Sequence, residues 1–181
     1  NPSLVGSEMC IRDSYLEGFH IPFVHEGLNK VLDYGSYTTE LHKYSSLQIG
    51  YSDDSNETFD LPKGHIDYGK QVAAYYYWVF PNMMFNFYPW GLSVNIVKPI
   101  SINRTKVSFL TYIYDHSKLH KGAGNDIDKV EREDEFIVEN ESKGIQSSFY
   151  QAGRFSPTRE KGVHHFQRLI AQFLDLSLIH I

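Results

Sequence analysis

Hydrophobic residues gather in four strand-like runs near the middle of the chain. These runs cover residues 72–80, 83–90, 92–100 and 106–115, with turns at 81 and 102. Two earlier segments, 36–44 and 46–52, also have the composition of β-strands. A polar turn at 53–57 and a loop with Pro and Gly at 61–70 separate them from the main runs. The pattern predicts several consecutive strands.

Helical patterns flank these strands. Residues 15–30 are typical of a helix, or helical turns, interrupted near Pro22. A helix is predicted to begin near Asp126, and a set of its residues lines up along one side, called the seam below. A last helix over 160–174 has one apolar face. The seam holds Ile127, Val130, Asp134, Ile137 and Glu141, and the apolar face holds Val163, Phe166, Ile170, Phe173 and Leu174. Strands followed by helices predict an α+β fold, with an antiparallel sheet packed on one side by helices.

Composition narrows the class of protein. The 181 residues suffice for one domain with a core, and 15% of them are aromatic. With a net charge of −5 and no basic block, we expect no nucleic-acid partner. No apolar run is long enough for a membrane span, so we expect no membrane association. The single cysteine, Cys10, excludes an internal disulfide and a cysteine-based metal site, and a cytoplasmic location is the default.

Both ends of the sequence resemble translated sequencing adapters. The strings are "SLVGSEMCIRDS" at 3–14 and "LSLIHI" at 176–181. We therefore expect 1–14 and 176–181 to be non-native, and 15–175 to be the functional domain. We also expect the natural protein to continue beyond one or both ends.

The stretch "GFHIPFVHE" at 18–26 places two histidines five positions apart, with a proline between them. In a straight helix their side chains would point roughly 140° apart. Pro22 clashes with the carbonyl of Gly18 in a helix, and the resulting kink would let His20 and His25 converge. The alternative is a pair of ordinary, partly buried histidines. The apolar surroundings favour a shared metal ion, since buried neutral imidazoles need partners.

A third ligand should be a carboxylate, because no cysteine is usable. Asp134 lies on the apolar seam of the first C-terminal helix, where an unpaired carboxylate is costly, and Glu141 is a distant second. The alternative is a boundary aspartate in contact with solvent. Two histidines and one carboxylate on one face favour non-haem Fe(II) and O₂ chemistry.

The segment "YLEGFHIPFVHEGL" at 15–28 resembles the iron-binding segment of Rieske non-haem iron oxygenases, in the catalytic domain of the α subunit. The resemblance implies that His20 and His25 bind iron and that Glu17 carries electrons from a Rieske cluster, usually of a neighbouring subunit. "EREDEFIVENESKGIQSSFYQAGRFSP" and "GVHHFQRLI" resemble the choline and glycine-betaine monooxygenase branch. In that branch an "ED" pair supplies the carboxylate ligand, and the pair at 133–134 of this sequence implies that Asp134 is that ligand. The resemblance covers about 15–174 and implies a helix-grip domain like START and Bet v 1 proteins.

The same resemblance implies cofactors and partners. They are Fe(II), a [2Fe–2S] cluster, NAD(P)H through a separate reductase or ferredoxin, O₂, and a small organic substrate that is hydroxylated or demethylated. The cluster motif CxH…CxxH is not in this sequence, so we expect the Rieske domain to be missing and the fragment to be incompetent alone. The family implies a homotrimer for the full-length protein.

Aromatic strand residues are expected to line the substrate pocket. The segment "WVFPNMMFNFYPW" at 78–90 resembles cavity-lining strands of the family, and one parity should point inward. The predicted pocket residues are Met83 (or Met84), Phe85, Asn86, Tyr88 and Trp90. Trp90 with the tyrosines at 75–77 would suit a quaternary ammonium group through cation–π attraction. The alternative is that these residues are plain core aromatics.

Two other classes of protein compete with an oxygenase. A metal-free START-like module would bind an apolar ligand with the same aromatic strands. A zinc hydrolase is disfavoured because HExxH is missing. The adjacent pair His164–His165 is not expected to bind metal, because neighbouring side chains on a helix diverge.

Overall fold

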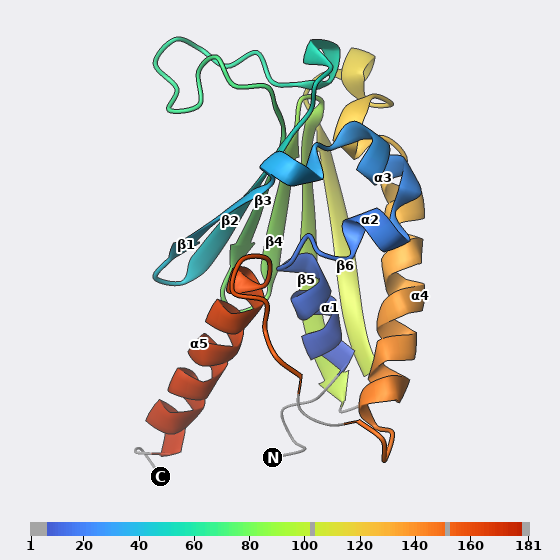
Figure 1. Cartoon of the computed structure of the whole chain (residues 1–181), viewed down its shortest axis with the longest axis vertical. Helices are drawn as coiled ribbons and strands as arrows, with labels where there is room; N and C mark the ends of the chain where they lie inside the picture. Colours follow the sequence, from blue (N-terminus) through green and yellow to red (C-terminus); the bar gives the residue numbers. More distant parts are fainter. Residues whose placement is uncertain (1–6, 102–103, 151–152, 179–181) are drawn as a thin grey trace.

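One antiparallel sheet forms the centre of the protein. A computed structural model describes residues 7–101, 104–150 and 153–178. Six strands pair in chain order, each with the next (Figure 1). They are β1 (Thr38–His42), β2 (Ser45–Tyr51), β3 (Val72–Val79), β4 (Met83–Tyr88), β5 (Gly91–Ser101) and β6 (Arg104–Ile113). The six predicted strands are all present, while the predicted turn at 102 lies outside the described residues.

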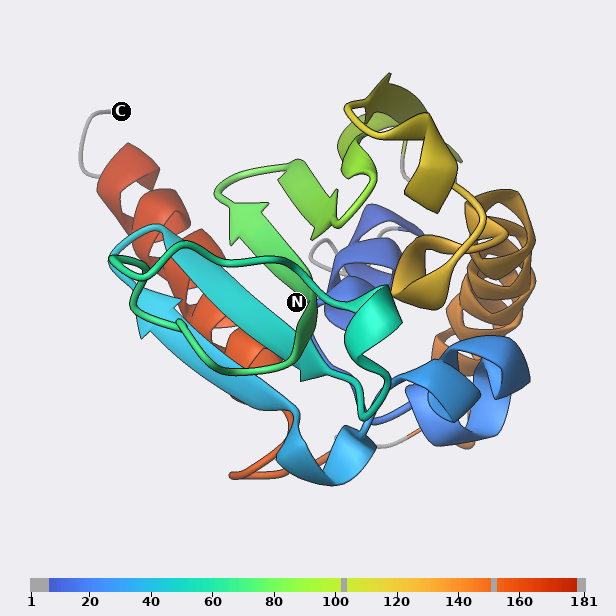
Figure 2. The ribbon, with the colours of Figure 1, turned by 90° about the horizontal axis from the view of Figure 1, so that it is seen from above.

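The helices cover one face of this sheet, as predicted. They are α1 (Ser7–Tyr15), α2 (Ile21–Val24), α3 (Glu26–Val31), α4 (Ile127–Ile145) and α5 (Lys161–Leu178). Seen from above, α4 and α5 lie at opposite ends of the curved sheet, with α1 between them (Figure 2). The α+β prediction is confirmed. Among the described residues, no helix has both the length and the apolar composition that crossing a membrane requires.

Side-chain alternation decides which strand residues meet the helices. In the register of β3 with β4, Tyr76 pairs with Asn86 and Trp78 with Met84, so these four side chains share a face. On that face Trp78 packs edge-on against Phe166 of α5, with ring centroids 5.1 Å apart. Both rings are fully buried, as is Leu16 just after α1. This cluster fastens α1 and α5 to the sheet.

The N-terminal helix begins earlier than predicted. Residues 7–14, expected to lie outside the domain, form most of α1, and Cys10 within it is buried. The mixed composition of this short segment has no clear helical period, so the sequence pattern missed it. Whether these residues are native to the protein stays a prediction, and residues 1–6 and 179–181 lie outside the described part.

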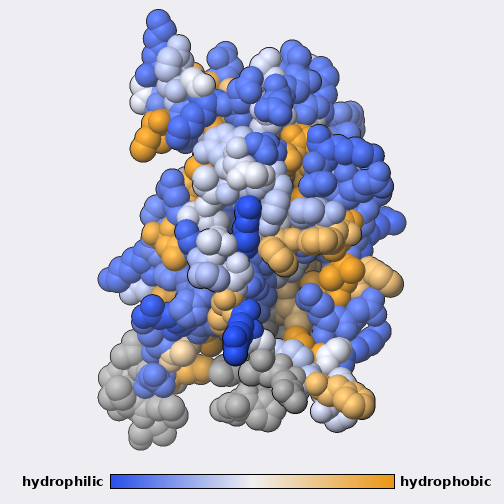
Figure 3. All heavy atoms as spheres, viewed as in Figure 1, coloured by the Kyte–Doolittle hydropathy of each residue, from blue (hydrophilic) through white to orange (hydrophobic). Residues whose placement is uncertain are grey.

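The buried side of α4 also differs from the predicted seam. Val138 is its buried residue, whereas Ile137 is half-buried and Glu141 is exposed. Val138 lies four residues after Asp134 and therefore on the same side of the helix. Asp134 itself stays on the inner side. The molecular surface in the view of Figure 1 is mainly hydrophilic, with scattered hydrophobic groups (Figure 3).

Replacing Gly124 by alanine is expected to destabilise the fold by about 1–3 kcal/mol through overpacking. An added Cβ would collide with Nε1 of the buried Trp90 and lie 2.8 Å from the Tyr88 ring. Gly27→Ala is the matched control, since nothing lies within 4 Å of its added Cβ and alanine favours the helix. Urea unfolding of both variants measures the difference. Equal midpoints would contradict this packing account.

Candidate metal centre

Two short helices, α2 and α3, bring the two predicted histidines together. His20 directly precedes α2, and His25 separates α2 from α3. The backbone of His25 leaves the helical region, with φ −108° and ψ 76°. Pro22 lies in the first turn of α2, where a missing N–H costs nothing. The predicted departure from a regular helix is therefore present, but the predicted cause is wrong, because the break at His25, not a kink against Gly18, turns the second ring.

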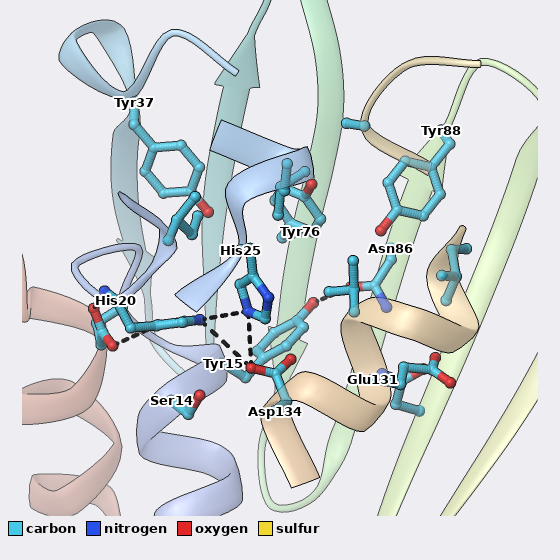
Figure 4. A pocket seen from close by; sticks show the side chains of 17 residues that line it. Ser14, Tyr15, His20, His25, Tyr37, Tyr76, Asn86, Tyr88, Glu131 and Asp134 are labelled. Carbon is cyan, nitrogen blue, oxygen red and sulfur yellow. Dashed lines mark hydrogen bonds and ion pairs between the residues drawn. The ribbon is translucent and has the colours of Figure 1, made fainter. Parts of the chain in front are cut away.

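Nε2 of His20 and Nε2 of His25 lie 3.2 Å apart (Figure 4). From α4, Oδ1 of Asp134 lies 3.0 Å from Nε2 of His25 and 3.6 Å from Nε2 of His20. The three residues thus each offer one ligand atom, and these atoms all lie within 4.8 Å of one another. Ligands at right angles on one ion, with bonds of about 2.1 Å, are separated by roughly 3 Å. The three predicted ligands are brought together in a geometry that fits a metal ion.

The outer nitrogen of each ring also faces a carboxylate. Nδ1 of His20 lies 2.7 Å from Oε1 of Glu17, and Nδ1 of His25 lies 2.9 Å from Oε2 of Glu133. A neutral imidazole that donates through Nδ1 keeps an acceptor at Nε2. Two ring nitrogens and a carboxylate oxygen, all acceptors, then point at one another. Such a group needs a proton or a metal cation among its members.

His25 is the most buried member of the cluster, with a side chain 1% exposed. Burial pushes its pKa down, but hydrogen bonds and charge from Asp134 and Glu133 outweigh burial and raise the pKa above its ordinary value. Asp134 and Glu133 thus favour positive charge at this site. A divalent cation satisfies that preference without a proton.

A cavity of about 100 Å³ adjoins the cluster, which is room for a small molecule. Its lining includes His20, His25 and Asp134, four tyrosines, and the polar residues Asn86, Asn95 and Glu131. The tyrosines are Tyr15, Tyr37, Tyr76 and Tyr88. Burial raises the pKa of Tyr15 and Tyr76, so both stay neutral phenols. The hydroxyl of Tyr15 donates to Oδ1 of Asn86 at 2.7 Å.

The predicted pocket residues divide by strand parity. Asn86 and Tyr88 lie in the cavity wall. Met83 and Phe85 have the opposite parity and lie on the other face of β4, whereas Met84, the alternative to Met83, lines a second cavity. Trp90 is buried behind Tyr88, with ring centroids 5.2 Å apart, and does not line the cavity. Of the tyrosines at 75–77, only Tyr76 lines it.

A second, wider cavity of about 1260 Å³ runs between α4 and strands β5 and β6. Both cavities are lined by Ser14, Tyr15, Asn95, Glu131 and Asp134. Glu131 therefore lies where they meet. Burial, followed by the charges of Asp128 and Asp134, raises the pKa of Glu131 to about 7. The wider cavity thus meets the small cavity beside the group of His20, His25 and Asp134.

Several residues of the site were missed from the sequence. Tyr37 lies just before β1, and no motif in the sequence marks it as a site residue. Glu131 and Glu133 belong to an acidic helix segment, and the sequence alone does not distinguish them from solvent-exposed carboxylates. His164 and His165 are not members of the group that His20, His25 and Asp134 form.

The fold and the site define a class of protein: an α+β domain with two histidines and a carboxylate grouped beside a cavity. A model of the family "Ring hydroxylating alpha subunit (catalytic domain)" matches residues 10–176, and the chain belongs to this family. The family resemblance noted in the sequence is confirmed.

Curated relatives and solved structures agree with this assignment. Choline monooxygenase of Arabidopsis thaliana, a chloroplastic protein, is 33% identical over 172 residues, covering 91% of this chain and 38% of that protein. The carnitine monooxygenase oxygenase subunit of Escherichia coli (strain K12) is 26% identical, covering 90% and 45%. A structure of the quaternary ammonium Rieske monooxygenase CntA has the same fold, with a TM-score of 0.70 and 21% identity over 92% of this chain and 46% of that chain. The chain spans less than half the length of each of these relatives.

Proposed function

We propose that this chain is the catalytic domain of a Rieske-type oxygenase that hydroxylates or oxidatively demethylates a quaternary ammonium compound with mononuclear Fe(II) and O₂. The observation that carries the proposal is the grouping of Nε2 of His20, Nε2 of His25 and Oδ1 of Asp134 beside a small cavity. Two imidazoles and one carboxylate are the donor set of non-haem Fe(II) oxygenases. When bound, the ferrous ion would supply the site for O₂ activation.

The chain's own residues would hold and orient these participants. His20, His25 and Asp134 would bind the ion on one side and leave its other side toward the cavity. Glu17 is the proposed electron bridge, which its 2.7 Å contact with the outer nitrogen of His20 supports. Electrons would come from a [2Fe–2S] cluster on a Rieske domain, supplied in turn by NAD(P)H through a reductase or ferredoxin. The full-length protein would form a trimer in which Glu17 faces a neighbouring subunit.

The wall of the cavity beside the three ligands suits a cationic substrate. Tyrosine faces attract cations, and Tyr76 and Tyr88 meet there edge to face, with centroids 5.9 Å apart. When it is ionised, the carboxylate of Glu131 adds negative charge where the two cavities meet. The choline and carnitine named for the relatives both carry quaternary ammonium groups. A small cationic substrate therefore fits better than a neutral aromatic one.

The cavity disfavours a metal-free START-like binding module. A pocket for an apolar ligand would not need Asn86, Asn95, Glu131 and Asp134 in its wall. Such a module would also have no need for the three acceptor atoms of His20, His25 and Asp134 to lie close together. We therefore keep the oxygenase proposal.

Anaerobic loading with Fe(II), followed by nitric oxide as an O₂ analogue, tests the proposal directly. We expect the electron paramagnetic resonance signal of an iron–nitrosyl complex, and a change in that signal when choline is added. The change is expected because the cavity adjoins the ligand cluster. No signal would overturn the iron site, and a signal unaffected by choline, carnitine or glycine betaine would overturn the substrate class.

Iron affinity is expected to fall as the pH falls through the raised pKa of His25. The imidazole must lose its proton before it binds a metal. Since Asp134 and Glu133 raise this pKa against the effect of burial, the proton competes with the metal at a higher pH than for an ordinary histidine. Anaerobic titrations at about pH 6, 7 and 8 would measure this competition. Equal affinities across that range would contradict it.

A further inference from the structure

Glu133 contacts a metal-ligand candidate in the same way that Glu17 does, but on the other histidine. Oε2 of Glu133 lies 2.9 Å from Nδ1 of His25, and Oε1 of Glu17 lies 2.7 Å from Nδ1 of His20. The family resemblance accounts for Glu17 as an electron bridge. No role follows from it for Glu133, which stands out only in the structure.

Consecutive residues of α4 hold the two nitrogens of one ring. Asp134 reaches Nε2 of His25 at 3.0 Å, while Glu133 reaches Nδ1. Side chains at neighbouring helix positions point about 100° apart, so both can bind the same imidazole only when its two nitrogens face the helix. The orientation of the His25 ring is therefore specified by α4, an element more than a hundred residues away in the sequence.

The contact also favours the tautomer that a metal ligand requires, because it gives a proton on Nδ1 an acceptor. A proton on Nδ1 that is donated to Glu133 leaves the lone pair of Nε2 directed at the metal position. The side chain of His25 is 1% exposed, so bulk water is a poor substitute for Glu133. Glu133 itself is 31% exposed, with Nζ of Lys129 3.9 Å from its other oxygen. Its removal should therefore affect His25 more than the fold.

We propose that Glu133 is a positioning residue of the metal centre, which orients His25 and keeps its Nε2 available as a ligand. This inference rests on the proposed function, because it concerns the same metal site. A carboxylate behind a ligating histidine fixes the ring and strengthens it as a donor, and loss of such a group lowers metal affinity by about 10–100-fold.

Cobalt(II) is the probe for the test, since its visible absorption reports the ligand field. The variants are Glu133→Ala and Glu133→Gln, and the controls are the same two changes at Glu135, an exposed residue of the same helix. We expect Glu133→Ala to weaken cobalt binding by about 10–100-fold and to change the absorption at saturation. Glu133→Gln should lose less, because its amide oxygen still accepts the Nδ1 proton. A purely structural role would alter the unfolding midpoint but not the spectrum at saturation.

Affinities and spectra of the Glu133 variants that match those of the Glu135 variants would overturn the inference. If Glu133→Ala does not fold, Glu133→Gln decides: a loss of more than about threefold with a changed spectrum supports the role, and a match with Glu135→Gln refutes it. One cobalt ion per wild-type chain, together with unaffected Glu133 variants, would refute the role of Glu133 alone. Absence of metal binding by the wild-type chain would refute the proposed function as well.

Discussion

Replacing Asp134 by alanine is expected to lower the affinity of the chain for ferrous iron by at least ~100-fold, because the change removes the only carboxylate among the three proposed ligands. Only two of the three proposed ligands would remain, the ring nitrogens of His20 and His25. They would also lose the oxygen that lies 3.0 Å from His25 and 3.6 Å from His20. Anaerobic titration in competition with a chelator measures the loss.

The matched control is Glu135→Ala, which removes a carboxylate from the next position of α4 on its exposed side. Its iron affinity should equal that of the wild-type chain. Far-ultraviolet circular dichroism of both variants checks that α4 is intact. Iron affinity lost equally in both variants would mean that the charge of the helix, and not the position of Asp134, attracts the ion.

Replacing Glu131 by glutamine is expected to weaken choline binding roughly tenfold, because the junction of the two cavities loses a negative charge that attracts the cation. Binding to the Fe(II)-loaded chain would be measured by calorimetry without O₂, at about pH 8, where a carboxyl of pKa about 7 is ionised. The neutral analogue 3,3-dimethylbutan-1-ol has the same shape as choline. Its affinity should not change in the variant.

The difference between the two ligands separates charge from shape. Equal losses for choline and for the neutral alcohol would show that the substitution deforms the cavity. No loss for either ligand would remove Glu131 from the substrate path. Glu135→Gln again serves as the control, since it removes the same charge from the exposed side of α4.

Local patterns in the sequence were enough to predict the sheet and the three proposed ligands. Alternating apolar runs predicted the strands, since each run is a local signal. Asp134 stood out because a carboxylate on the inner side of a helix needs a partner, and α4 indeed places it beside His25. The predicted grouping of His20, His25 and Asp134 is present, although their role as iron ligands stays a proposal.

The remaining features depend on contacts between distant segments. The parity of β4 could not be read from its sequence, because Met83 and Phe85 are as apolar as the inward-facing Met84. The turn of His25 depends on the end of α2, not on a proline kink. Glu133 became distinct from its acidic neighbours only when α4 was placed against His25, a pairing across 108 positions.

X-ray absorption at the iron edge of the anaerobically loaded chain is the decisive measurement for the proposed metal centre. We expect one ferrous ion per chain with two imidazole nitrogens in its coordination shell, and loss of that ion in His25→Ala and Asp134→Ala. A chain that binds no iron, or one whose bound iron keeps the same coordination in both variants, would contradict the proposed metal centre.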